Sequence, residues 1–251
     1  MSDLVLYEVA GGVATITLNR QDKLNAINWE IIEGVDEAFV RAEADDDVKA
    51  VVITGTGKAF SVGDDLEQAW SGERFEALMK RFKEQPEEAE SNRQFDFPKP
   101  VIVAVNGYCF GGAIEFVLWA DVLIAADDAQ FATQFVKYGL TGGAVTFYRL
   151  PRLIGHSNAS YMLLTGERVG AEEALRMGLV TKVVPRTELV AEAQKIAGTI
   201  ASFPEEAVRH TREAMRVSLR ATREGQRDIT VFSNRLLASL FERMGAGSKS
   251  G

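Results

Sequence analysis

The sequence predicts an α/β fold in which parallel strands are joined by helices. Three apolar segments, Val48–Thr54, Val101–Val105 and Val122–Ala126, have the composition of buried strands. Helical patterns separate strand segments of this kind, which indicates parallel crossover units. With 251 residues, the chain is long enough for one large α/β domain or for a domain with a helical appendage.

The first elements are expected to be a hairpin and a helix. Leu4–Val9 and Val13–Leu18 alternate in polarity on either side of Gly11-Gly12, which predicts two antiparallel strands. Asn28 is a plausible N-cap for a helix. The apolar residues that follow it at helical spacing are Ile31, Ile32, Val35 and Phe39.

From Thr146 onward the chain is predicted to be mostly helical. The charged stretch from Leu66 to about Asn92 also has a helical pattern, and Val180–Val184 is a short β-type segment. Three successive helices are expected at Glu188–Ser202, Pro204–Arg220 and Ile229–Met244. We therefore expect a core over residues 1–200, then a C-terminal helical region over 201–251 whose last residues, Gly245–Gly251, form a flexible tail.

The composition limits the possible function classes. A net charge of −8, with no block of basic residues, argues against a nucleic-acid partner. No apolar stretch approaches the roughly 20 residues of a membrane span, and the N-terminus lacks a signal-peptide pattern, so a cytoplasmic protein is expected. The single cysteine, Cys109, excludes an internal disulfide and is interpreted as a small buried residue. The only histidines are His156 and His210, and neither lies in a recognised motif. The sequence therefore predicts no metal-binding cluster and no Ser/His/Asp catalytic triad.

One carboxylate stands in an apolar setting. Glu115 interrupts Gly112–Ala120, a run that is otherwise apolar or glycine and that follows the strand Val101–Val105 and a glycine pair. A strand, a glycine turn and a helix together aim free backbone N–H groups at a charged or polarised group. Gly112 and Glu115 share the first helical turn, which suits acid–base chemistry on a carbonyl compound. The structural alternative is a carboxylate favoured by the helix dipole, typically worth about 0.3–1 kcal/mol.

A second segment, Lys58–Leu66, has the same layout of strand end, glycine turn and helix. The backbone N–H groups of Asp64 and Gly112 are the two that can converge on one oxygen. Two such donors around a carbonyl oxygen form an oxyanion hole, in which losing one donor costs about 2.7–4 kcal/mol in barrier. Either glycine turn alone is weak evidence, because strand–helix junctions often use glycine for geometry. Their combination favours catalysis.

From Val13 to about Phe203 the chain resembles the crotonase superfamily, also called the enoyl-CoA hydratase/isomerase family. Motifs in the family's order carry the resemblance, and chance agreement is implausible. They are Asn19-Arg20, Lys23-Leu24-Asn25-Ala26, Phe60-Ser61-Val62-Gly63-Asp64-Asp65-Leu66, Lys99-Pro100-Val101, Asn106-Gly107-Tyr108, Gly111-Gly112-Ala113-Ile114-Glu115, Ala129-Gln130-Phe131, Leu163-Leu164-Thr165-Gly166, Ala174 and Gly178-Leu179-Val180.

The resemblance implies a superhelix of ββα turns with a C-terminal helical trimerisation region, and a homotrimer or a dimer of trimers. It implies acyl-CoA thioester substrates, as in fatty acid metabolism, and no cofactor beyond the coenzyme A of the substrate. An enolate would be held by the backbone amides of Asp64 and Gly112, with Glu115 as general acid/base. The remaining residues expected to contact substrate or coenzyme A are Lys23, Leu24, Ala26, Phe60, Val62, Asp65, Leu66, Gly111 and Phe135.

One position departs from the family pattern. Family hydratases use a second glutamate where this chain has Phe135, and a phenylalanine cannot transfer protons. The side chain of Asp64 is the best candidate for a replacement. A carboxylate so close to an enolate would need a raised pKa; the alternative is an ordinary capping or turn residue. Lys137, Tyr138 and Tyr148 are weaker candidates.

The expected function is therefore that of an enoyl-CoA hydratase or isomerase. Two alternatives stay open. One is an acyl-CoA decarboxylase or another enolate reaction, because a single acid suits chemistry with fewer proton transfers. The other is a non-catalytic acyl-CoA-binding protein of the same fold, because the second glutamate is missing.

Overall fold

The computed structural model describes residues 3–68, 71–85 and 97–220, with the single residues 231, 235, 238 and 242. Its larger sheet has the strand order β1-β2-β3-β5-β7-β10. Strands β1 and β2 form the predicted antiparallel hairpin, and the other neighbours pair in parallel. The strands are β1 (Val5–Ala10), β2 (Val13–Leu18), β3 (Ala50–Gly55), β5 (Val101–Val105), β7 (Val122–Ala126) and β10 (Lys182–Val184).

Four short strands, which the sequence did not predict, form a second sheet. Its order is β4-β6-β8-β9, with β4, β6 and β8 parallel. The strands are β4 (Ala59–Ser61), β6 (Tyr108–Phe110), β8 (Gln130–Ala132) and β9 (Val169–Gly170). Each of β3, β5 and β7 is followed by one of these short strands before the next helix. The chain therefore repeats a ββα unit, as the family resemblance implied.

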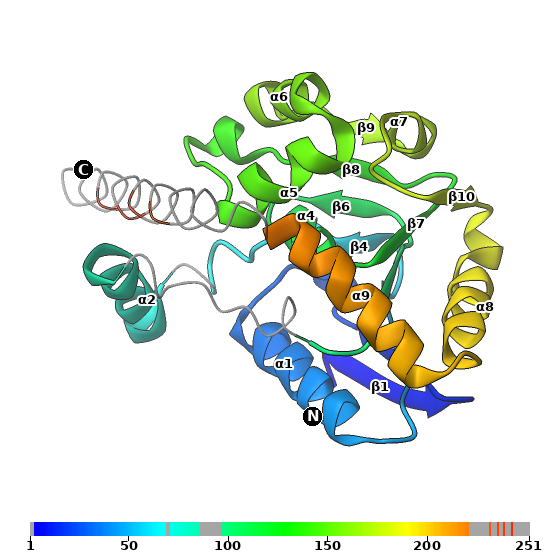
Figure 1. The fold of residues 1–251 in the computed structure, drawn as a ribbon. Coiled ribbons are helices and arrows are strands. Elements are labelled where there is room, and N and C mark those ends of the chain that lie inside the picture. The colour runs from blue at the N-terminus through cyan, green and yellow to red at the C-terminus, as the bar shows by residue number, and fades with distance from the viewer. Residues whose placement is uncertain are drawn as a thin grey trace.

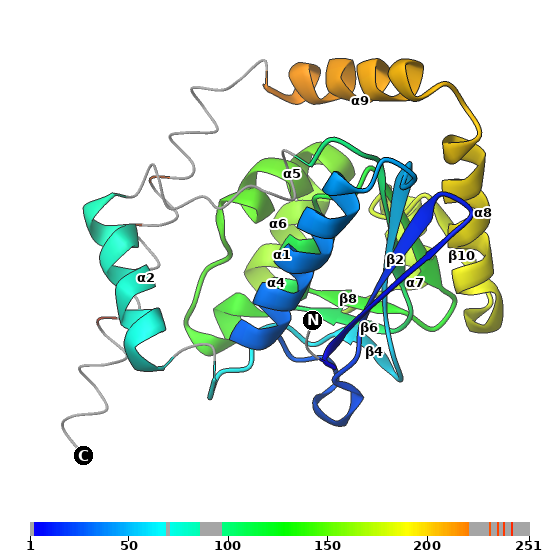
Figure 2. The ribbon, with the colours of Figure 1, turned by 90° about the horizontal axis from the view of Figure 1, so that it is seen from below.

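Helices enclose the larger sheet (Figures 1 and 2). Helix α1 (Trp29–Ala44) begins where predicted, and the Asn28 side chain accepts a hydrogen bond from the backbone N–H of Ile31. Figure 2 shows α1 and α8 on opposite sides of the sheet. The other helices are α2 (Gly72–Glu84), α4 (Gly112–Val117), α5 (Ala144–Ile154), α6 (His156–Thr165), α7 (Ala171–Met177), α8 (Leu189–Ala201) and α9 (Glu205–Arg220), with short 3-10 turns at η1 (Gln21–Lys23), η2 (Phe135–Tyr138) and η3 (Arg186–Glu188).

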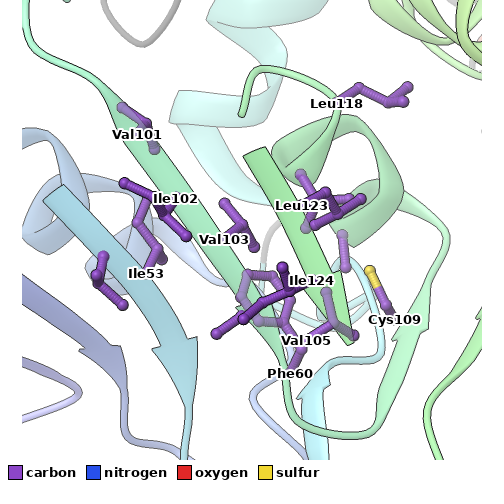
Figure 3. Packing of buried hydrophobic residues seen from close by; sticks show 14 of the residues in the cluster. Ile53, Phe60, Val101, Ile102, Val103, Val105, Cys109, Leu118, Leu123 and Ile124 are labelled. Atoms are coloured by element: carbon purple, nitrogen blue, oxygen red, sulfur yellow. The ribbon is translucent and has the colours of Figure 1, made fainter. Parts of the chain in front are cut away.

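The core lies between the two sheets and the helices around them. Strand β5 is buried along its whole length, since both of its faces are covered. Figure 3 shows the core side chains of β5 and β7 in one cluster with Phe60 of β4. Cys109 is fully buried there, and burial raises the pKa of its thiol, so its interpretation as a small core residue is confirmed.

The predicted boundaries hold best for the strands. The helix expected from Leu66 begins only at Gly72, because the carboxylate of Asp65 accepts hydrogen bonds from the N–H groups of Glu67 and Gln68 and forms a turn. The end expected near Asn92 lies outside the described residues. So does the tail at 245–251, and so does most of the helix at 229–244. The division at residue 200 stays a prediction.

Helix α9 is tied to the larger sheet through Asp121. The carboxylate of Asp121 accepts a hydrogen bond from the N–H of Val101 at 2.8 Å and pairs with Arg212 of α9 at 2.7 Å. Arg212 also donates to the carbonyl of Phe97. In residues 3–68, 71–85 and 97–220, none of the helices is both long and apolar enough to cross a membrane.

Candidate active site

The two predicted glycine turns touch each other. Gly63 has a φ of +92°, which favours glycine, and a Cβ at this position would lie 2.7 Å from the carbonyl oxygen of Phe110. The same Cβ would lie 3.1 Å from the backbone nitrogen of Gly112. Any larger residue at position 63 would therefore separate the turn after β4 from the turn after β6. The two segments come from neighbouring strands of the second sheet, which explains why they meet.

The backbone N–H groups of Asp64 and Gly112 lie at this contact. Within the described part of the chain, neither donates a hydrogen bond to another residue. On either side of Asp64, the N–H of Ile27 donates to the carbonyl of Gly63 and the N–H of Asp65 donates to the carbonyl of Ile27, so the N–H of Asp64 donates to none of the other described residues. Gly112 is the first residue of α4, whose leading N–H groups have no partner within the helix. These are the two donors for which the sequence predicts an oxyanion hole, and that role stays a prediction.

The Asp64 carboxyl group lies beside these donors. It accepts a hydrogen bond from its own backbone N–H, and burial raises the pKa of this carboxyl group to about 6. Both of its oxygens lie 3.0 Å from the position of a Cβ on Gly112. The side chain therefore lies close to Gly112, beside the two predicted oxyanion donors, and it still keeps some accessible surface.

Glu115 lies in the first turn of α4, as predicted, and reaches across to α5. Its Oε1 accepts a hydrogen bond of 2.7 Å from the hydroxyl of Thr146 and a further one from the N–H of Gly143. Burial raises the pKa of Glu115 to about 7, against the lowering effect of the two hydrogen bonds, and the nearby charge of Asp64 adds to the rise. A carboxyl group with this pKa can both give and take a proton near neutral pH.

Phe135 lies near the hydroxyl group that binds Glu115. Its ring carbon Cε2 lies 3.1 Å from the position that a Cβ on Gly142 would take, and the Thr146 hydroxyl lies 3.0 Å from the same position. The phenylalanine ring and the hydroxyl that binds Glu115 are therefore neighbours. The place where the resemblance implied a second acid is apolar.

The weaker candidates for a second acid point elsewhere. Lys137 pairs with Glu167 at 3.0 Å on the surface, and Tyr138 is 60% exposed. Tyr148 is buried, with the guanidinium of Arg152 3.9 Å from its ring centroid. Among the residues that the structure describes, Asp64 is the one charged group that contributes to the pKa of Glu115.

The two loops expected to bind coenzyme A are joined by Arg20. Its guanidinium pairs with Asp65 at 2.6 Å and donates to the carbonyl of Ala26 at 3.0 Å. The N–H of Val62 donates to the carbonyl of Leu24, which completes the connection. The carboxylate of Asp65 thus holds the loop together, and the predicted contacts of these loops with coenzyme A stay predictions.

The candidate binding residues differ in exposure. Lys23, Leu24 and Leu66 are exposed, and Ala26 is buried. The partly exposed candidates are Val62, Asp65, Gly111 and Phe135. Phe60 is fully buried, with its side chain in the core, and its predicted contact with ligand stays a prediction. Sequence reasoning missed Arg20, Gly143 and Thr146 as site residues. The only signal for Arg20 was its place beside Asn19 in a family motif.

Comparisons with known proteins place this site in a family. The sequence pattern of the family described as Enoyl-CoA hydratase/isomerase matches residues 8–244. A probable enoyl-CoA hydratase of Mycobacterium bovis is 35% identical over 239 residues, which cover 95% of this chain and 90% of that protein. A carnitinyl-CoA dehydratase of Salmonella typhi is 37% identical over 219 residues, which cover 87% of this chain and 82% of that protein.

A solved structure agrees with these matches. The enoyl-CoA hydratase/isomerase from Xanthobacter autotrophicus Py2 superimposes with a TM-score of 0.82 at 34% identity, over 96% of this chain and 88% of that one. The crotonase fold that the motifs predicted is thereby confirmed. The chain belongs to the enoyl-CoA hydratase/isomerase family of enzymes, the crotonase superfamily.

Proposed function

We propose that the protein acts on an acyl-CoA thioester through an enolate, as an enoyl-CoA hydratase or isomerase. The observation that carries the proposal is the position of Glu115, with a pKa of about 7, in the same helical turn as Gly112, whose backbone N–H and that of Asp64 donate to no other described residue. The thioester oxygen would lie between the N–H groups of Asp64 and Gly112. Negative charge that develops on this oxygen is stabilised by donors already in place.

Glu115 would move the proton. In hydration, its carboxylate takes a proton from water as the water oxygen bonds to C3 of the enoyl group, and the electron pair of the double bond moves into the enolate. The enolate collapses when C2 receives a proton, either from Glu115 or from a second acid. In isomerisation, Glu115 removes a proton at one carbon and returns it two carbons away. Each version uses the protein's own groups and the substrate's coenzyme A, without an added cofactor.

We propose Asp64 as the second acid. Its carboxyl group lies over Gly112 and its pKa is about 6, so a substantial fraction is protonated in mildly acidic solution. A protonated Asp64 does not repel the enolate and has a proton to give. An ionised Asp64 would compete with the enolate for the same two donors, so the protonation state of Asp64 governs substrate binding as well as turnover.

The alternative reaction is decarboxylation of a malonyl-type thioester. The apolar Phe135 beside Thr146 favours it, because the enolate left after loss of CO₂ needs only one proton. A protein that binds acyl-CoA without turnover is the non-enzymatic alternative. We further propose assembly as a homotrimer or a dimer of trimers, which sedimentation velocity would test.

Turnover separates these possibilities. The wild type and Glu115→Gln are assayed for turnover of a panel of enoyl-CoA and malonyl-CoA thioesters. The affinity of each protein for the same thioesters is measured by calorimetry. Hydration or isomerisation that Glu115→Gln abolishes supports the proposal, whereas release of CO₂ supports the decarboxylase. Binding by the wild type without any turnover would overturn an enzymatic role.

A further inference from the structure

The two carboxyl oxygens of Glu115 have different surroundings. Oε1 accepts two hydrogen bonds, one from the hydroxyl of Thr146 at 2.7 Å and one from the N–H of Gly143. Oε2 accepts none from the residues that the structure describes, while the residue as a whole retains accessible surface. One oxygen is therefore bound to the protein, and the other is left for a ligand.

The donors to Oε1 belong to the start of one helix. Gly143 is the N-cap of α5, and Thr146 lies in its first turn. The Glu115 carboxylate thus takes the place of a capping group for a helix that is distant in sequence, and the helix dipole favours its negative charge. This contact lowers the pKa of Glu115 and so opposes burial and the charge of Asp64, which both raise it.

The Thr146 side chain is itself held in place. Thr146 is fully buried. A Cβ on Gly142 would lie 3.0 Å from its hydroxyl oxygen and 3.1 Å from both its Cβ and the ring of Phe135. Because position 142 is glycine, the threonine side chain and the phenylalanine ring can both border this space, and full burial limits the movement of the hydroxyl away from Glu115.

We propose that Thr146 is a positioning residue that binds Oε1 of Glu115 and so makes Oε2 the oxygen that exchanges the proton with substrate. The inference rests on the proposed role of Glu115 as general acid/base. Without the hydroxyl, the carboxyl group keeps only one of its two donors and can rotate, and the ionised form loses a favourable hydrogen bond. Loss of Thr146 therefore slows proton transfer more than it weakens thioester binding.

The first test does not depend on turnover. The Glu115 carboxyl group is titrated by ¹³C NMR in unliganded protein labelled at glutamate Cδ, and its signal is assigned by its absence in Glu115→Gln. In Thr146→Val we expect the pKa of Glu115 to rise, and in Thr146→Ser, which keeps the hydroxyl, to stay at the wild-type value. An unchanged pKa in Thr146→Val, or an equal shift in both variants, overturns the inference even if the enzyme is active.

The second test uses the reaction. With the best thioester of the panel, Thr146→Val should lower kcat about tenfold, the effect of losing a hydrogen bond to a charged group, and move the acidic limb of the pH profile upward. KM should change less than twofold, and Thr146→Ser should restore kcat. The matched control is Thr54→Val, since Thr54 is also buried and donates at 2.9 Å to the carbonyl of Ala104, far from the site in sequence. An increase of KM with unchanged kcat contradicts a positioning role.

The two tests also separate this inference from the proposed function. If no thioester is turned over but the pKa shifts as expected, the proposed function fails and the contact between Thr146 and Glu115 stands. If turnover is found and Thr146→Val has the pKa and pH profile of the wild type, the proposed function stands and the positioning role fails.

Discussion

The carboxyl group of Asp64 lies directly over Gly112, with each of its oxygens 3.0 Å from the position that a Cβ on Gly112 would take. The backbone N–H groups of Asp64 and Gly112 are the two proposed oxyanion donors. The side chain of Asp64 is thus placed where the substrate oxygen is expected, and the absence of a side chain at position 112 is what leaves it room.

Substitution of Gly112 by alanine should abolish most activity. The added methyl group would press on both oxygens of Asp64 and widen the gap between the two amides. Because one lost oxyanion donor costs about 10²–10³ in kcat, we expect kcat to fall at least 100-fold. Steady-state kinetics with the best thioester measures this. Gly198→Ala is the control, because Gly198 lies within α8 with open space around its Cβ position; equal activity of the two variants would argue against the oxyanion hole.

Asp64→Asn tests whether turnover needs the acidic proton of Asp64, because the substitution removes this proton and nearly keeps the size of the side chain. The amide has nearly the same size but cannot give a proton to the enolate, so we expect kcat to fall by about 10²-fold, the lower end of general acid catalysis. Binding of a saturated acyl-CoA should become independent of pH near pH 6, because the competing carboxylate is gone. Rates and calorimetric binding between pH 5 and 8 check both points. Wild-type turnover in Asp64→Asn would eliminate Asp64 as the second acid.

Glu115 should make the fold less stable as the pH rises. Its folded-state pKa of about 7 lies above the ordinary value of 4.5, so the folded state holds this proton more tightly than the unfolded state. The free energy of unfolding therefore falls between about pH 4.5 and pH 7, by at most about 3 kcal/mol from this group. Glu115→Gln removes the penalty. Urea unfolding should show a stability gain over wild type that grows from pH 5 to pH 8, and a gain that does not vary with pH would contradict the raised pKa.

The sequence was sufficient for the parts of the site that depend on local backbone geometry. The bounds of β2, β5 and β7 agree with the prediction, and Glu115 does lie in the first turn of a helix that begins at Gly112. A strand, a glycine turn and a short helix form from neighbouring residues, so their pattern is visible in the chain. The Asn28 cap was predictable for the same reason.

Contacts between distant segments could not be predicted in this way. Thr146 binds Glu115 across 31 positions, and nothing in the local sequence of α5 marks its hydroxyl as a donor to a carboxylate. The second sheet was missed because strands of three residues are too short for a periodic pattern. Arg20 is nearly buried although arginine is usually exposed, because Asp65 and the Ala26 carbonyl satisfy its guanidinium.

The Arg20–Asp65 pair should control binding of coenzyme A more than chemistry. The two side chains are 9% and 11% exposed and are 2.6 Å apart, and they join the Lys23–Ala26 loop to the turn that carries Asp64. Asp65→Asn leaves a buried guanidinium with a weaker partner, so we expect a loss of about 1–3 kcal/mol in stability and a several-fold increase in KM. The kcat should change less, because Glu115 is not in contact with the pair. Glu173→Gln is the control, since Glu173 pairs with Arg176 on an exposed face and such pairs contribute little. Melting temperatures and KM values for the same thioester measure both effects, and a KM equal to that of the control would remove Asp65 from the binding site.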